Sequence, residues 1–140
     1  VEFLITTNKK YAARSLNRIA SGGELSRISL AIQVVTANTS RIPTLVFDEV
    51  DVGIGGATAE VVGALLRDLG TKTQIICVTH LAQVAAKGNQ HLRVNKQEDG
   101  IQVTPLNRSR RVKELARMLG GIELTEQSIA HAEQILGNAH

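Results

Sequence analysis

The chain is poor in aromatic residues, cysteine and proline. Aromatic side chains make up 2% of its 140 residues and tryptophan is absent, so a core must be built from Ile, Leu, Val and Ala, as in a parallel sheet covered by helices. Two prolines argue against a disordered chain. The single cysteine, Cys77, cannot form an internal disulfide, which favours a reducing compartment, and its apolar neighbours favour the interpretation of a small buried hydrophobe.

The sequence also has no long apolar run. A membrane-spanning helix needs about 20 apolar residues, and no stretch of this chain approaches that length. No basic segment followed by an apolar one stands at the start, as a secretory signal requires. We therefore predict a soluble, cytoplasmic protein with no membrane partner. The first residue is Val1 rather than Met, in a segment that already has the pattern of a strand, so we expect a piece of a longer chain.

Apolar periodicity predicts one α/β domain over residues 1–140. Residues 1–7 alternate as in a half-buried strand, whereas residues 44–47 and 74–78 are continuous apolar runs, typical of central strands covered on both faces. Residues 91–95 and 101–104 alternate around a turn-forming cluster and predict an antiparallel edge hairpin. Helical spacing occurs in the segments 24–37, 58–69, 81–86, 110–119 and 125–136. This order predicts a mainly parallel sheet flanked by helices.

A glycine pair opens the first predicted helix. Ser21 and Glu24 have the spacing of a capping box, which accounts for these two residues but not for Gly22 and Gly23 between them. Each glycine in a first helical turn costs on the order of 1 kcal/mol relative to alanine. The pair therefore indicates either a structural tight turn or a phosphate held on bare backbone N–H groups at the positive end of the helix.

Two carboxylates follow the first central strand directly. In open α/β sheets ligands bind beyond the carboxyl ends of the strands, and Asp48 and Glu49 stand at such an end. One carboxylate can hold Mg²⁺ through water while its neighbour polarises an attacking water; the alternative is two acids at a solvated strand end. Asp51 either extends this acidic cluster or caps the following turn.

His80 ends the next predicted strand. If the strands over 44–47 and 74–78 are neighbours, its imidazole stands beside the carboxylates, where a phosphate sensor would lie. A cap or an ordinary surface histidine is the alternative.

Two further motifs are weak. The run Gly53-Ile54-Gly55-Gly56 lacks the full spacing of a dinucleotide-binding loop. The densest basic cluster could meet DNA phosphates, but an acidic residue lies close by and no aromatic residues are interleaved, so a solvated helix face is the better interpretation. This cluster consists of Arg108, Arg110, Arg111 and Lys113.

The order of these motifs resembles that of ABC-type ATPases. Residues 20–24 (ASGGE) are similar to the signature motif, residues 44–49 to the Walker B strand, and residues 78–80 to the segment of the switch histidine. With their flanking residues, the runs SGGELSR (21–27), FDEVDVG (47–53), VTHLAQV (78–84) and ELARMLGG (114–121) resemble the RecN family of bacterial SMC-like double-strand-break repair proteins. The resemblance covers essentially the whole chain.

The resemblance implies an ATPase head in which two protomers sandwich two ATP molecules. It implies that Asp48 coordinates Mg²⁺ through water, that Glu49 is the general base and that His80 senses the γ-phosphate. Ser21, Gly22, Gly23 and Glu24 would serve the nucleotide of the opposite protomer. The D-loop region would comprise Asp51, Gly53 and Gly55. The implied partners are a second head, the N-terminal P-loop lobe of the same protein and DNA, in the nucleoid of a bacterium.

Two features depart from the family pattern. The chain contains no Gly-x-x-x-x-Gly-Lys-Ser/Thr, so the P-loop is absent, and we expect the C-terminal lobe of a head, unable to complete an ATP site alone. Gly55 stands where SMC proteins have the D-loop Asp. The alternatives are the nucleotide-binding domain of a transporter, whose usual Gln-Gln-Arg run is missing here, and a non-catalytic DNA- or protein-binding lobe.

Overall fold

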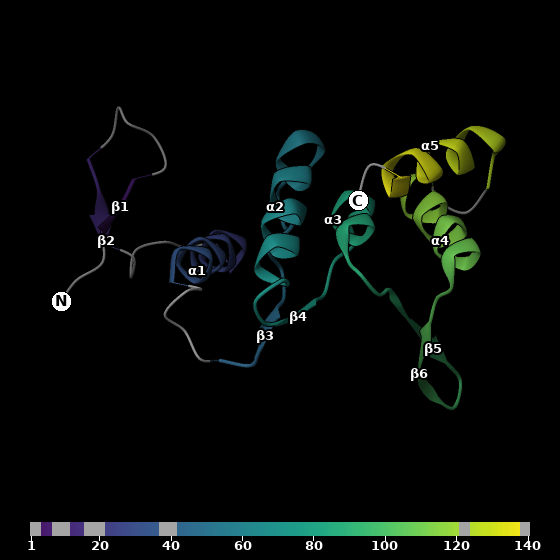
Figure 1. Cartoon of the computed structure of the whole chain (residues 1–140), viewed down its shortest axis with the longest axis horizontal. Helices are drawn as coiled ribbons and strands as arrows, with labels where there is room; N and C mark the ends of the chain where they lie inside the picture. Colours follow the sequence, from purple (N-terminus) through teal and green to yellow (C-terminus); the bar gives the residue numbers. More distant parts are fainter. Residues whose placement is uncertain (1–3, 7–11, 16–21, 37–41, 121–123, 138–140) are drawn as a thin grey trace.

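The computed structural model describes residues 4–6, 12–15, 22–36, 42–120 and 124–137, which form helices and three two-stranded sheets (Figure 1). β1 (Leu4–Ile5) pairs antiparallel with β2 (Arg14–Ser15). β3 (Thr44–Phe47) and β4 (Gln74–Cys77) form a parallel pair, and β5 (Leu92–Gln97) and β6 (Gly100–Pro105) form an antiparallel hairpin. The helices are α1 (Gly22–Thr36), α2 (Gly56–Leu69), α3 (Ala82–Lys87), α4 (Arg108–Gly120) and α5 (Glu126–Gly137).

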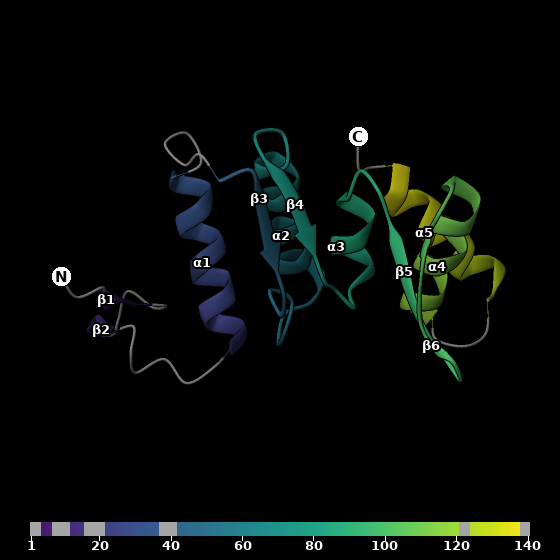
Figure 2. The same cartoon turned by 90° about the horizontal axis from the view of Figure 1, so that it is seen from below.

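Strands and helices lie in two layers. Figure 2 shows β3, β4 and the β5–β6 hairpin in front of α2, α4 and α5, and Figure 1 shows the same separation from a perpendicular direction. α2 connects the parallel strands β3 and β4, as parallel pairing requires. The predicted α/β class, with a parallel sheet flanked by helices and an antiparallel hairpin, is confirmed. Within the described residues the parallel part consists of this one pair.

One core cluster packs α2 against a single face of the parallel pair. Strand alternation turns Leu45, Phe47, Ile75 and Cys77 toward the helix, where Phe47 is buried and the other three are partly buried. Cys77 is thus a packed apolar side chain, as predicted. The buried members of the cluster are Leu30, Phe47, Val50, Ala59, Val62, Leu66, Leu69 and Val84.

A second cluster joins α3, α4 and α5. Its small residues, Ala82, Ala86, Ala116 and Ala132, let the three helices approach closely around Leu115, which is fully buried. None of the helices in the described part of the chain has the length and apolar character needed to cross a membrane.

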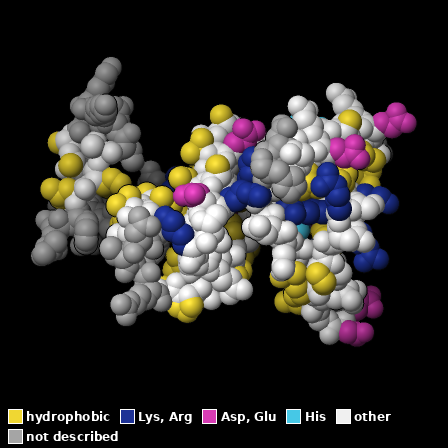
Figure 3. Space-filling view, in the orientation of Figure 1, with side chains coloured by type: hydrophobic (Ala, Val, Ile, Leu, Met, Phe, Trp, Pro, Cys, Tyr) yellow, Lys and Arg dark blue, Asp and Glu magenta, His cyan; other side chains and the backbone are white. Residues whose placement is uncertain are grey.

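The opposite face of the strands is apolar and uncovered. Val46, Ile76 and Val78 stand on this face of the parallel pair, with exposed fractions of 67%, 47% and 57%. The hairpin exposes Leu92, Val94, Ile101 and Val103, and Figure 3 shows apolar side chains gathered on it. The prediction that both central strands are covered on both faces is therefore wrong for this structure, because the described residues supply a helical layer on one face only.

The interpretation of the basic cluster as a solvated helix face is correct for Arg108, Arg110 and Lys113, which are exposed, but wrong for Arg111. Its guanidinium Nη2 donates to the carbonyl oxygens of Ala85 (3.1 Å), Ala86 (2.9 Å) and Gly88, where α3 ends. Burial lowers the pKa of Arg111. An arginine at a helix C-terminus satisfies carbonyls that the helix itself leaves unpaired, so Arg111 joins α4 to α3.

Candidate functional site

The parallel pairing of β3 and β4 brings two predicted site segments to one sheet edge. Phe47 lies opposite Cys77, and the ladder continues where the Val78 N–H donates to the Phe47 carbonyl at 2.9 Å. Asp48 and Glu49 follow directly on one strand, and Thr79 and His80 follow on the other. The prediction that these two strands are neighbours is confirmed, and His80 stands at the same end of the sheet as the carboxylate pair.

The chain turns sharply at the carboxylate pair. Asp48 accepts a hydrogen bond on Oδ1 from the Glu49 N–H at 2.9 Å, and Glu49 has a φ of 60°, in the left-handed region. This conformation costs a non-glycine residue about 1–2 kcal/mol, and such outliers cluster at functional sites. Both side chains are exposed. The turn therefore presents two carboxylates to solvent immediately beyond β3.

Asp51 lies under the turn and connects it to His80. Its side chain is 2% exposed, and its Oδ2 accepts hydrogen bonds from the Thr79 hydroxyl and from the His80 N–H at 3.0 Å. The same oxygen lies 3.2 Å from His80 Nδ1, whereas the histidine side chain is 67% exposed. Thr79 Oγ1 in turn accepts from the Leu81 N–H at 3.0 Å. Asp51 thus bridges the segments that follow β3 and β4, a connection that sequence reasoning left open.

Thr79 was missed altogether by sequence reasoning. Its position directly before His80, in the turn between β4 and α3, is the signal that could have identified it, because Ser and Thr side chains frequently organise such turns.

Of the glycine-pair motif, only the backbone from Gly22 onward belongs to the described residues. Gly22 and Gly23 form the first turn of α1, as predicted. Ser21 and the side chain of Glu24 lie outside the described part, so the capping box stays a prediction. Further along α1, the Arg27 guanidinium donates to the Val52 carbonyl at 2.7 Å and joins this helix to the loop after Glu49.

That loop leads into α2 through the glycine-rich run. Gly53 and Gly56 have φ values of 72° and 52°, whereas Gly55 is extended with a φ of −168°. Two of the glycines are therefore required by backbone conformation alone.

The pKa of the Cys77 thiol reflects the negative charge at this sheet edge. Burial and then the carboxylates of Asp51 and Asp48 raise the pKa of its thiol from 9.0 to about 11. The thiol donates to the Val78 carbonyl at 3.7 Å and is a protonated core side chain.

A divalent cation at this edge would need ligands beyond those of the described residues. Among them no group of three or more His, Cys, Asp or Glu side chains could hold a metal ion. Mg²⁺ commonly uses only one or two carboxylates together with water and substrate phosphates. The exposed Asp48 carboxylate, with Oδ1 oriented by the Glu49 amide, fits such a partial site.

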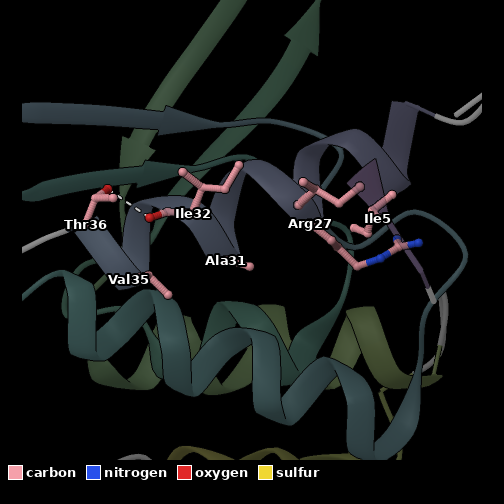
Figure 4. A pocket seen from close by; sticks show the side chains of 7 residues that line it. Ile5, Arg27, Ala31, Ile32, Val35 and Thr36 are labelled. Atoms are coloured by element: carbon pink, nitrogen blue, oxygen red, sulfur yellow. Dashed lines mark hydrogen bonds between the residues drawn. The ribbon is translucent and has the colours of Figure 1, made fainter. Parts of the chain in front are cut away.

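A groove lies elsewhere, along α1. It has a volume of about 660 Å³, and Figure 4 shows Ala31, Ile32 and Val35 along one side of the helix, with Ile5 near Arg27. The groove includes none of the carboxylate and histidine residues at the strand ends, so it does not bear on their chemistry.

Sequence comparison finds close relatives among curated DNA repair proteins named RecN. The chain is 51% identical to RecN of Vibrio cholerae over 140 residues, 52% identical to RecN of Xylella fastidiosa over 139, and 38% identical to RecN of Bacillus subtilis over 143. These matches cover 96–99% of the chain but only 25% of each relative, so the chain spans about a quarter of their length. No family model matches the chain.

Structural comparison finds SMC ATPase heads. An Smc head with coiled coil and joint from Pyrococcus yayanosii matches 80% of this chain and 24% of its own, with a TM-score of 0.64 and 20% identity. A chain from work on ATP-driven dimerisation and DNA-stimulated activation of SMC ATPases matches 83% of this chain and 79% of its own, with a TM-score of 0.59 and 20% identity. These likenesses show that the fold is that of part of an SMC head.

Proposed function

This chain belongs to the RecN family, and on that premise we propose that it is the C-terminal lobe of an SMC-like ATPase head that acts in double-strand-break repair and recombination of DNA. The observation that carries the proposal is the parallel pairing of β3 with β4. It brings Asp48 and Glu49, the proposed Walker B carboxylates, to the same sheet edge as His80, the proposed switch histidine. A shared edge is what a site needs in which several groups surround one terminal phosphate.

Each residue has a distinct proposed role. Asp48 holds Mg²⁺ through water, Glu49 accepts the proton of the attacking water, and His80 contacts the γ-phosphate. The bound cation would neutralise charge on the phosphates, and the protein contributes mainly positioning and electrostatic stabilisation. The exposure of Asp48, Glu49 and His80 suits this assignment, because all three remain accessible to a nucleotide.

The signature residues serve a second nucleotide. In this proposal the backbone of Gly22 and Gly23, with Ser21 and Glu24, contacts ATP held by the opposite protomer, so the heads pair through ATP. The start of α1 at Gly22 supports this, because the N–H groups of a first helical turn have no partner within the helix. Arg27, which joins α1 to the loop after Glu49, would link the signature helix to the carboxylate pair of its own protomer.

The uncovered strand face supports a missing partner layer. Val46, Ile76 and Val78 belong to runs of the kind that is buried on both faces, yet nothing in the described part of the chain covers one of these faces. The sequence also contains no P-loop. We propose that the N-terminal lobe of the same protein supplies both the phosphate-binding loop and the cover for this face. DNA binding and a place in the bacterial nucleoid belong to the full-length protein.

The general-base assignment is tested by Glu49→Gln in full-length protein. Since the amide cannot accept the proton, turnover should be abolished while ATP binding is retained. The matched control is Glu98→Gln in the β5–β6 turn, which should leave both unchanged. Full turnover in Glu49→Gln would remove this residue as the base.

The split-site proposal has a separate test. Calorimetric titration of ATP and Mg²⁺ onto this 140-residue chain should show no tight binding, because the P-loop is absent. Ile76→Glu, on the uncovered face, should leave the melting temperature of this chain nearly unchanged but lower that of the full-length protein. Lys113→Glu, an exposed position on α4 in the helical layer, is its control. Tight ATP binding by the chain alone, or equal melting of both full-length variants, would contradict the proposal.

A further inference from the structure

We propose that Asp51 is the positioning residue of His80: its buried carboxylate holds the imidazole by Nδ1 and so directs the Nε2 edge toward the nucleotide. The claim that Asp51 positions the imidazole of His80 rests on the geometry of this chain alone. Its consequence for turnover rests on the function proposed above.

The contrast in burial between the two side chains is the first argument. Asp51 is 2% exposed, whereas the His80 side chain is 67% exposed and would otherwise choose its rotamer in solvent. An exposed histidine can rotate about both side-chain torsions within nanoseconds. A contact of 3.2 Å from Nδ1 to a buried carboxylate oxygen restricts that rotation, because the carboxylate itself is fixed.

The fixation of Asp51 is the second argument. Its Oδ2 accepts from the Thr79 hydroxyl and from the His80 N–H, and its own carbonyl accepts from the Ile54 N–H at 3.3 Å. The adjacent Val50 is fully buried in the core below α2. The same oxygen therefore binds the backbone of His80 and faces its ring, which sets both the position of the residue and the orientation of its imidazole.

The chemistry of Asp51 and His80 determines which tautomer the neutral imidazole adopts. An ionised carboxylate is only an acceptor, so the ring nitrogen that faces it carries the proton. The neutral ring of His80 is then the Nδ1–H tautomer, and Nε2 is the nitrogen that lies away from Asp51. To donate to a phosphate, Nε2 must carry a proton as well, so the contact with the nucleotide is made by the imidazolium form, in which both ring nitrogens are donors. The anion at Nδ1 orients that ring and pairs with its charge.

The tautomer is measurable on the 140-residue chain itself. Long-range ¹H–¹⁵N correlation spectra of histidine-labelled protein, recorded at a pH where the ring is neutral, distinguish a protonated nitrogen from an unprotonated one. We expect His80 Nδ1 to be protonated and Nε2 to be unprotonated. An Nε2–H tautomer, or rapid averaging of both forms as in an unstructured peptide, would overturn the proposal without any variant.

Two variants separate positioning from loop structure. Asp51→Ala removes the acceptor altogether, whereas an Asn would keep an amide oxygen in the same place, so in Asp51→Ala the Nδ1–H preference of His80 should be lost. Thr79→Val removes the other side chain on Oδ2 and keeps the carboxylate, so the preference should persist. An unchanged tautomer in Asp51→Ala, or the same loss in both variants, would refute the assignment. Backbone amide spectra show whether each variant keeps the fold.

A double-mutant cycle in the full-length protein tests the consequence for catalysis. Asp51→Ala should lower kcat for ATP hydrolysis by about 10- to 100-fold, the usual effect of removing a group that orients an active-site histidine. In a His80→Ala background the same substitution should change kcat less than about twofold, because the group it positions is gone. Independent losses that multiply would refute positioning. If His80→Ala alone leaves turnover unchanged, the proposed function of His80 fails, whereas the tautomer result still decides the role of Asp51.

Discussion

Alkylation of Cys77 measures the electrostatics of the proposed site without a nucleotide. The chain has one cysteine, so any modification by iodoacetamide occurs at a single known position. Burial and the charges of Asp51 and Asp48 raise the thiol pKa from 9.0 to about 11. Because the thiolate is the reactive species, the reactive fraction at pH 8 is roughly 100 times smaller than for a thiol of pKa 9.0.

The assay is the pH dependence of the alkylation rate of the folded chain, followed by mass spectrometry. The rate should still rise about tenfold per pH unit between pH 9 and pH 10, because the thiol is far from half ionised there. A rate that levels off above pH 9 would refute the raised pKa. Restricted access slows the reaction at every pH but does not move the pH at which it levels off, so the profile separates a raised thiol pKa from poor access of the reagent to the sulfur.

A charge variant isolates the contribution of the site. Asp48→Asn removes one of the two negative charges that raise the thiol pKa, so alkylation at pH 8 should become several-fold faster. Glu98→Gln removes one charge from the β5–β6 turn and should leave the rate unchanged. Equal rates for Asp48→Asn and the unmodified chain would mean that Asp48 does not contribute and that burial and Asp51 alone raise the thiol pKa.

Three further predictions concern residues that hold the fold and shape the turn. Glu114 is buried and ion-paired with Arg93 and Arg117, and the hydrogen bonds from Arg117 lower its pKa. Its stabilisation is therefore full above the ordinary value of 4.5 and is lost as the pH falls through the lowered folded pKa. In urea titrations, Glu114→Gln should lower the free energy of unfolding by about 1–2 kcal/mol at pH 7. The loss should be much smaller at pH 3. Equal losses at both pH values would contradict this. Arg111→Met should lower the free energy of unfolding by about 2–4 kcal/mol, because the carbonyls at the end of α3 lose their donor. The control Lys113→Met, at an exposed position, should change it by no more than about 0.5 kcal/mol in the same assay. Similar losses in both variants would disprove the role of Arg111. Glu49→Gly relieves about 1–2 kcal/mol of left-handed strain against about 0.5–1 kcal/mol of added chain entropy, so the unfolding free energy should be unchanged or slightly higher; a clear loss would show that Glu49 does not adopt this conformation.

Secondary structure and the order of motifs were readable from the sequence. The continuous apolar runs at 44–47 and 74–78 became β3 and β4 with nearly the predicted bounds, and α2 and α3 ended at glycine residues that interrupt the apolar period. These features depend on local rules, because side-chain periodicity and backbone preference act over a few residues. β2 was missed, since two residues are too few to show any period.

The role of Asp51 was beyond sequence reasoning, although its position in the motif was plain. Its partners Thr79 and His80 are 28 and 29 residues away in the chain. Only the parallel register of β3 and β4 brings these segments together. Arg111 is similar: its sequence neighbours are basic and exposed, and only the packing of α4 on α3 turns its guanidinium onto carbonyls 23 to 26 residues away.

The sequence by itself thus determined which segments are strands and helices and which residue types stand at the strand ends, because both follow from local patterns. The tertiary structure decided which of those ends meet, which carboxylate is buried and which face of the sheet stays uncovered. Those outcomes depend on contacts between segments that are distant in the chain. The hydrogen bond from Thr79 to Asp51, for example, cannot be predicted from the positions of these two residues in the sequence.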